Sequence, residues 1–258
     1  EAAPNGWVME YYVGKDYSLG GITLLCKFDG QRVTMASQIA GADETVSSLY
    51  SVKSEQATML SFDTYNYLVH YFGQPQGSMA DDPNGTLGGD YEFVISDATA
   101  DRIELKGKKY GNRIVMKAFS ADQTWKQYLT RIKKVEDDAF FYEYDLRMDG
   151  LYTGQMLRSN YTFIVTYYDE VGKVHQKTVS FMFTTDGMRF HEPVTIDGQT
   201  MQNFVWKNEE ISFVCTDEGA TEVKLAGVYT AGYQSYDYYP GTYQMDFYRL
   251  NDATNQME

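Results

Sequence analysis

The sequence of 258 residues has few cysteines, few prolines and no long apolar run. Its two cysteines, Cys26 and Cys215, are too few for a Cys-rich zinc site or a disulfide-dense scaffold. Each lies within an apolar stretch, so we expect two buried free thiols, although the sequence leaves a bridge between them open. Five prolines argue against a disordered, linker-rich chain. No apolar stretch approaches the ~20 residues that a membrane-spanning helix needs.

Positive charge is also scarce, with 22 Lys and Arg against 36 Asp and Glu, for a net charge of −14. Such a protein repels phosphate groups, so we expect no nucleic-acid partner. The segment from Asp101 to Val135 contains ten Lys and Arg residues and three Asp and Glu residues, for a local net charge of +7. The rest of the chain therefore carries a net charge of −21. This pattern indicates internal charge complementarity with solvated faces, or a basic face for an anionic partner.

Tyrosine is abundant, with 23 residues, and aromatic residues make up 16% of the chain. Tyrosine suits a half-buried pleated surface, which favours β structure. Within Gly88–Lys117, apolar and polar residues alternate with a period of two, which is typical of strands with one buried face. A phosphate loop would continue from its Gly-Lys into Ser or Thr and a helix. Here "GKKYGN" leads into another strand, so we expect a turn and no phosphate site.

One segment predicts a helix, over residues 120–136. Ser120 and Gln123 have the spacing of a capping box, and the apolar residues from Trp125 to Val135 recur at helical spacing. Elsewhere strand patterns dominate, with the turn dipeptide Asp29-Gly30 marking a hairpin.

The two halves of the chain resemble each other loosely. "KFDGQRVTMAS" parallels "YYDEVGKVHQKTVS", "LSFDTYNYLVHYF" parallels "FTTDGMRFHEPVTI", and "GGDYEFVISDATADRIEL" parallels "MQNFVWKNEEISFVCTD", in the same order. We therefore expect a mainly β protein of two related antiparallel units, barrel-like or sandwich-like, with a lipocalin-like barrel as one form. The predicted units are residues 1–138, closed by the helix, and 139–258.

Three stretches resemble a family of uncharacterised Bacteroidetes lipoproteins, a group with a domain of unknown function. They are "MLSFDTYNYLVHYF", "GGDYEFVI" and "IELKGKKYGNRIVM", and the opening "APNGWVMEYYVGKDYSLGGITLLCKFD" fits the same family. The resemblance covers nearly the whole chain. It implies a cell-envelope location, as an outer-membrane lipoprotein facing the periplasm or the surface. It also implies an N-terminal lipid anchor that is not in this sequence, and it identifies no functional residues.

Catalytic motifs are absent from the sequence. The three histidines form no His-Glu-x-x-His motif, no Gly-x-Ser-x-Gly occurs, and adjacent acids such as Asp137-Asp138 and Glu209-Glu210 are typical of solvated loops. "DDPNG" offers oxygen ligands but does not match the calcium loop of an EF-hand. We therefore expect no metal site and no cofactor, and lean away from an enzyme.

The predicted function is ligand binding, as a non-enzymatic envelope accessory to the uptake of a glycan or a peptide. The alternatives are an envelope hydrolase acting on glycan or peptide, and a structural module that binds an envelope protein. Three candidate surfaces follow: the basic hairpin, the Gly73–Gly89 loop and the tyrosine-rich segment, which could instead be a strand pair with half-buried phenols. The candidate residues are Lys106, Lys108, Lys109, Arg113, Tyr229, Tyr233, Tyr236, Tyr238, Tyr239 and Tyr243.

Overall fold

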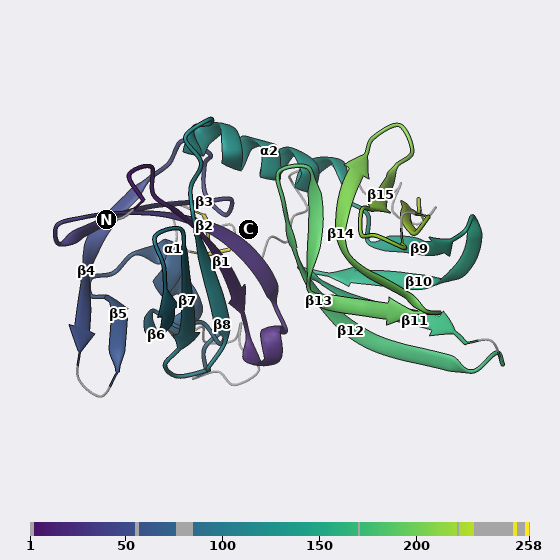
Figure 1. The fold of residues 1–258 in the computed structure, drawn as a ribbon, viewed down its shortest axis with the longest axis horizontal. Coiled ribbons are helices and arrows are strands. Elements are labelled where there is room, and N and C mark those ends of the chain that lie inside the picture. The colour runs from purple at the N-terminus through teal and green to yellow at the C-terminus, as the bar shows by residue number, and fades with distance from the viewer. Residues whose placement is uncertain are drawn as a thin grey trace. The chain divides into compact units, whose positions relative to one another are not determined.

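The protein is mainly β, with 54% of residues in strands and 11% in helices, as the alternating pattern predicted. The computed structural model describes residues 3–54, 57–75, 85–169, 171–220 and 222–229, and the backbone of the short strands β17 (Leu250–Asn251) and β18 (Gln256–Met257). The chain divides into two compact units, Glu1–Leu129 and Thr130–Glu258. Figure 1 shows both units as wrapped antiparallel sheets.

The first unit is a closed barrel of eight antiparallel strands, each paired with its neighbour along the chain. Pairing of β1 with β8, where Trp7 faces Ala118, closes it. Its strands are β1 (Trp7–Val13), β2 (Gly20–Asp29), β3 (Arg32–Ser37), β4 (Val46–Ser54), β5 (Thr58–Phe62), β6 (Glu92–Ala98), β7 (Arg102–Gly107) and β8 (Arg113–Ala118). The β2–β3 turn is the expected one, because Gly30 adopts the positive φ of 58° that a tight hairpin needs.

Aromatic and aliphatic side chains fill this barrel, which is typical of eight strands. Tyr11 and Phe93 are fully buried, with ring centroids 6.2 Å apart. Between β5 and β6 the chain forms α1 (Tyr67–His70) and the single turn η2 (Tyr71–Gly73), and a second such turn, η1 (Lys15–Tyr17), follows β1. The Asn66 side chain caps α1 by accepting from the Leu68 amide, and Phe72 packs against Tyr11.

The second unit is another closed barrel of eight antiparallel strands. Pairing of β16 with β9, where Leu225 faces Leu146, closes it. Its strands are β9 (Glu143–Met148), β10 (Leu151–Ser159), β11 (Thr162–Tyr168), β12 (Val174–Phe183), β13 (Gly187–Ile196), β14 (Gln199–Lys207), β15 (Ser212–Cys215) and β16 (Lys224–Gly227). Stacked and edge-on phenylalanines form its core, including Phe163 and Phe181 with ring centroids 4.5 Å apart.

The amphipathic helix is α2 (Trp125–Asp138), and the boundary between the two compact units falls within it. Its predicted start at Ser120 is wrong. The capping box is Thr124 with Gln127, because the Thr124 hydroxyl accepts from the Gln127 amide while the Gln127 carboxamide oxygen accepts from the Thr124 amide. Both pairs have the same spacing in sequence, and only the second lies at the first turn of α2.

Each half of α2 packs within its own unit. Leu129 joins Leu25, Ala36 and Phe119 in a buried cluster on the first barrel. Toward its other end, the buried Glu136 carboxylate accepts a hydrogen bond of 2.5 Å from the Tyr161 hydroxyl of the second barrel. Among the described residues no helix is both long and apolar enough to cross a membrane.

The structure has two units with the same strand order, as the sequence repeat predicted, but two of the three matched pairs of segments are misaligned. The middle pair sets the end of β5 and α1 against the end of β12 and the whole of β13. "KFDGQRVTMAS" contains the second and third strands of its barrel, β2 and β3, whereas "YYDEVGKVHQKTVS" contains the third and fourth, β11 and β12. The last pair matches, since both segments hold the sixth and seventh strands. Period-two alternation recurs in many of the strands, so it does not by itself determine which strands correspond.

Candidate ligand-binding surfaces

The glycine- and lysine-rich turn between β7 and β8 binds an internal carboxylate. The Asp90 carboxylate accepts hydrogen bonds from the amides of Lys109 at 2.7 Å and Tyr110 at 3.1 Å. Burial raises the pKa of Asp90, and these two amides oppose that effect. A Cβ on Gly107 would lie 2.1 Å from the carboxylate, which is why glycine stands there. The backbone amides of Lys109 and Tyr110 therefore already donate to Asp90 of the same chain.

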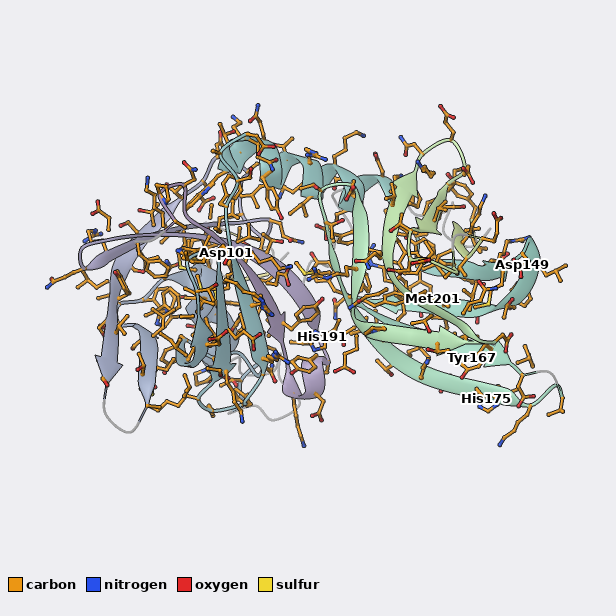
Figure 2. All side chains as sticks on the ribbon, in the orientation of Figure 1. Asp101, Asp149, Tyr167, His175, His191 and Met201 are labelled. Carbon is orange, nitrogen blue, oxygen red and sulfur yellow. The ribbon has the colours of Figure 1, made fainter. Side chains whose placement is uncertain are left out.

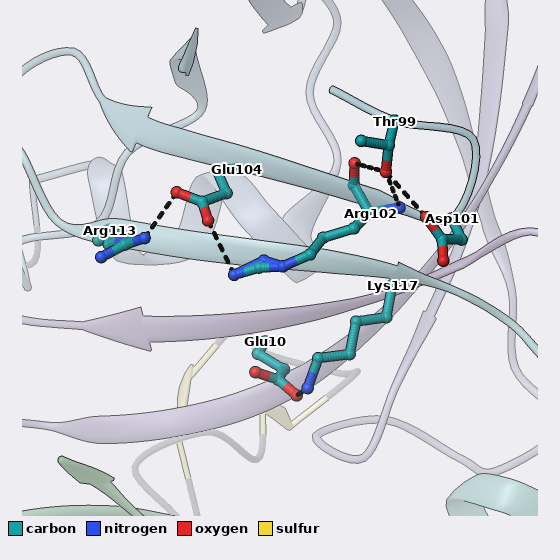
Figure 3. A network of polar contacts seen from close by, with 7 residues as sticks. All are labelled: Glu10, Thr99, Asp101, Arg102, Glu104, Arg113 and Lys117. Carbon is teal, nitrogen blue, oxygen red and sulfur yellow. Dashed lines mark hydrogen bonds and ion pairs between the residues drawn. The ribbon is translucent and has the colours of Figure 1, made fainter. Parts of the chain in front are cut away.

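The cations of this region pair with acids on adjacent strands. Lys108 lies 2.9 Å from Glu92, and Arg113 lies 2.6 Å from Glu104. Figure 3 shows Glu104 between Arg102 and Arg113, with Lys117 reaching Glu10. Such exposed pairs contribute about 0–1 kcal/mol each. Their arrangement agrees with internal charge complementarity, the first of the two interpretations of the basic segment.

Some of the remaining predicted site residues lie within the part of the chain that the structure describes, and others lie outside it. Lys106 and Lys109 have exposed side chains, and the Lys109 ammonium lies 4.9 Å from the Tyr110 ring centroid. Tyr229 is 66% exposed, and its ring meets Phe141 edge-on with centroids 4.9 Å apart. The rest of the tyrosine-rich candidates lie outside the described residues: Tyr233, Tyr236, Tyr238, Tyr239 and Tyr243. Residues 76–84 of the predicted loop also lie outside them.

His70 and His175 have specific structural partners. The ring nitrogens of His70 lie 3.2 Å from the Asn66 amide and 3.1 Å from the Phe62 carbonyl oxygen. Burial lowers the pKa of His70, so the neutral ring is favoured. His175 lies 2.8 Å from the Asp169 carboxylate and stacks on Tyr167, with centroids 5.2 Å apart, in the β11–β12 hairpin labelled in Figure 2.

The acids singled out in the sequence also have local partners. Asp138 pairs with Lys134 at 2.8 Å, and Glu210 pairs with Lys224 at 2.6 Å. The described part of the chain holds no group of three or more His, Cys, Asp or Glu side chains suited to a metal ion. Both cysteines are buried free thiols, as predicted, and burial raises the pKa of Cys215 to about 11.

A surface that the sequence analysis missed lies on the outer face of the second barrel. We call it the tyrosine face, formed by Tyr152, Gln155, Thr166, Tyr168 and Gln176 from β10, β11 and β12. Gln155 faces Thr166 and Thr166 faces Gln176 across the ladders, so the three share one row. Because neighbouring rungs alternate in direction, this row points away from the buried Phe163 and Val165.

The two tyrosines of this face stay accessible. Tyr152 is 53% exposed and Tyr168 is 49% exposed. Partial burial raises the pKa of Tyr152, and the charges of Asp145, Tyr168 and Glu143 raise it further. Asp145 is paired with Arg147 at 2.7 Å, and Glu143 accepts from Gln155 at 2.6 Å. The face thus combines aromatic rings with largely compensated polar groups.

Comparisons with known proteins give a family but no activity. No curated protein matches this chain. Among solved structures, the receptor-binding domain of botulinum neurotoxin type G is 8% identical, over 90% of this chain and 62% of that chain, with a TM-score of 0.12. A similarity this low carries no argument about fold or function. A family model described as a domain of unknown function, DUF4302, matches residues 1–208, and the chain therefore belongs to that family.

Proposed function

We propose that this protein is a non-enzymatic binding protein of the bacterial cell envelope that holds a glycan for uptake. In this proposal it is an outer-membrane lipoprotein of a Bacteroidetes species, attached by an N-terminal lipid outside the present sequence. The resemblance of its motifs to such lipoproteins supports the location. Labelling of the full-length precursor with radioactive palmitate in its host tests the anchor, and an unlabelled, secreted product would contradict it.

The observation that carries the binding proposal is the tyrosine face. A tyrosine ring offers a flat apolar surface to the C–H face of a sugar ring, at a low cost in side-chain entropy. The carboxamides of Gln155 and Gln176 and the hydroxyl of Thr166 can donate to and accept from sugar hydroxyls.

The hydrogen bonds and ion pairs of the described histidines and paired acids favour a binding function over hydrolysis. His70 and His175 contact backbone or a local carboxylate, and the paired acids Asp138 and Glu210 form ion pairs with lysines. A glycosidase needs two carboxyl groups that flank one substrate bond. The carboxylates near Tyr152 instead belong to outer-face pairs, with Arg147 and with Gln155.

Affinity electrophoresis tests the proposal directly. Native gels are cast with starch, xylan, mixed-linkage β-glucan or mannan, and the migration of the wild-type protein is compared with that of Tyr152→Ala/Tyr168→Ala. We expect at least one polysaccharide to retard the wild type and the double variant to bind about tenfold more weakly, since central aromatic residues carry much of a binding energy.

The matched control is Tyr142→Ala, which removes an exposed tyrosine outside the tyrosine face. We expect this variant to migrate like the wild type. Equal retardation of the wild type and the double variant would exclude the tyrosine face as the site. If none of the four polysaccharides retards the wild type, glycan binding itself is wrong.

A further inference from the structure

We propose that the first barrel carries a second site for the same kind of neutral sugar polymer, on an aromatic platform formed by Tyr65, His70 and Tyr91. This inference rests on the proposed function for the class of ligand. It uses different residues in a different unit, so the two sites can fail separately in one experiment.

The platform is a set of three rings in which His70 contacts both tyrosines. The rings of His70 and Tyr91 are stacked, with centroids 4.6 Å apart and planes 21° apart. The Tyr65 ring lies 5.6 Å from the His70 ring at an angle of 44°. Tyr65 is 61% exposed and Tyr91 is 40% exposed, so both tyrosine rings are accessible to solvent.

The rings are held in place before any ligand arrives. Both nitrogens of His70 contact the backbone, at Asn66 and Phe62, so this ring cannot turn without losing hydrogen bonds. Gly73 lies against Tyr91, because a Cβ there would meet the tyrosine ring at 2.9 Å. The backbone of Tyr91 accepts from the Phe62 amide at 3.1 Å. A rigid aromatic surface loses little entropy on binding, which favours affinity.

Charged side chains close to the platform in sequence and in the sheet compensate each other. Asp63, two residues before Tyr65, lies 3.3 Å from Lys53. Glu92, directly after Tyr91, lies 2.9 Å from Lys108. Ser61 faces Glu92 across the β5–β6 ladder and donates to Asp63 at 2.7 Å, which joins the two pairs into one band.

This band selects the chemistry of the ligand. It presents two cations and two anions, so it attracts neither a polyanion nor a polycation strongly. Its ammonium and carboxylate groups can still donate to and accept from hydroxyl groups. Flat rings beside a compensated polar band fit an uncharged, hydroxyl-rich ring such as a hexose or pentose unit of a polysaccharide.

The experiment uses isothermal titration calorimetry with the hexasaccharide of whichever polysaccharide retards the wild type. We expect two hexasaccharides per wild-type chain, and one per chain for either Tyr65→Ala/Tyr91→Ala or Tyr152→Ala/Tyr168→Ala.

The matched variant Tyr65→Phe/Tyr91→Phe keeps both rings and removes only the hydroxyls, so we expect it to retain two sites. Near-UV circular dichroism and the thermal midpoint establish that each variant is folded. A stoichiometry of one for the wild type that is lost only in Tyr152→Ala/Tyr168→Ala would overturn the platform and leave the tyrosine face standing. A stoichiometry of one for the wild type that is lost only in Tyr65→Ala/Tyr91→Ala would exclude the tyrosine face and leave the platform as the site.

Discussion

At the residue scale, the polar side chains of Asp90 and His70 connect parts of the first barrel. Asp90 takes the two amide donors of the lysine-rich turn, and His70 links α1 to the end of β5. Both side chains are held by backbone partners that lie far from them in sequence or across a turn. Their environments shift both pKa values through burial, upward for the acid and downward for the imidazole.

His70 predicts a pH dependence of stability. Its folded pKa is below the unfolded value of about 6.5, so the unfolded state binds the proton more readily. The contribution of neutral His70 to the free energy of unfolding is therefore complete above about pH 6.5. It is lost as the pH falls from there toward the folded pKa of His70. We expect the urea midpoint to drop between pH 7.5 and pH 5.5, and the drop to be smaller in His70→Gln. An equal drop in both proteins would show that other groups cause it.

At the element scale, glycines mark where the strands of the second barrel approach closely. Gly187 opens β13, and a Cβ there would lie 1.8 Å from the Phe204 carbonyl oxygen and 2.7 Å from the Val205 Cα. Gly187 and Val205 are partners in the β13–β14 ladder. The obstacle is backbone, which cannot turn aside as a flexible side chain can, so the ladder itself would have to shift.

Gly187→Ala should destabilise the protein by about 1–3 kcal/mol or more, since overpacking forces backbone displacement. Denaturant unfolding followed by circular dichroism measures this. Gly41→Ala is the matched control, because its Cβ would make ordinary contacts from 3.5 Å outward. We expect the control to unfold within about 0.5 kcal/mol of the wild type. A Gly187 variant as stable as the control would mean that β13 and β14 pair differently.

At the scale of the whole molecule, net charge limits the partners. A chain of net charge −14 repels polyanions, and its basic segment is largely compensated by ion pairs such as Lys108–Glu92 and Arg113–Glu104. Both barrels close through a ladder between their first and last strands, β1 with β8 and β9 with β16. The mode of recognition that we propose is contact by outer-face side chains.

Binding of a neutral polysaccharide should therefore depend little on salt. We expect the Kd to change by less than about twofold between 50 and 500 mM NaCl, because screening acts on charges and the proposed contacts are rings and hydroxyl partners. Calorimetric titrations at the two salt concentrations provide the measurement. A Kd that rises steeply with salt would point to a charged ligand at the basic hairpin.

The amino-acid sequence by itself determined the class of fold, the presence of the amphipathic helix and the β2–β3 turn, and it favoured free cysteines without excluding a bridge. These follow from local patterns: alternation, helical periodicity, turn dipeptides and cysteine count. It did not determine the start of α2, because Ser120–Gln123 and Thr124–Gln127 have equivalent spacing. It also misaligned two of the three matched pairs of segments, because period-two alternation recurs in many strands and does not tell one from another.

Only the tertiary structure decided which side chains meet. Tyr65, His70 and Tyr91 come from a loop, a short helix and the residue before β6, and no sequence spacing marks them as neighbours. Tyr152 and Tyr168 stand on adjacent strands whose register is set by the ladder between β10 and β11. The physical reason is that barrel closure and strand register are long-range pairings, whereas the patterns readable in a sequence are local.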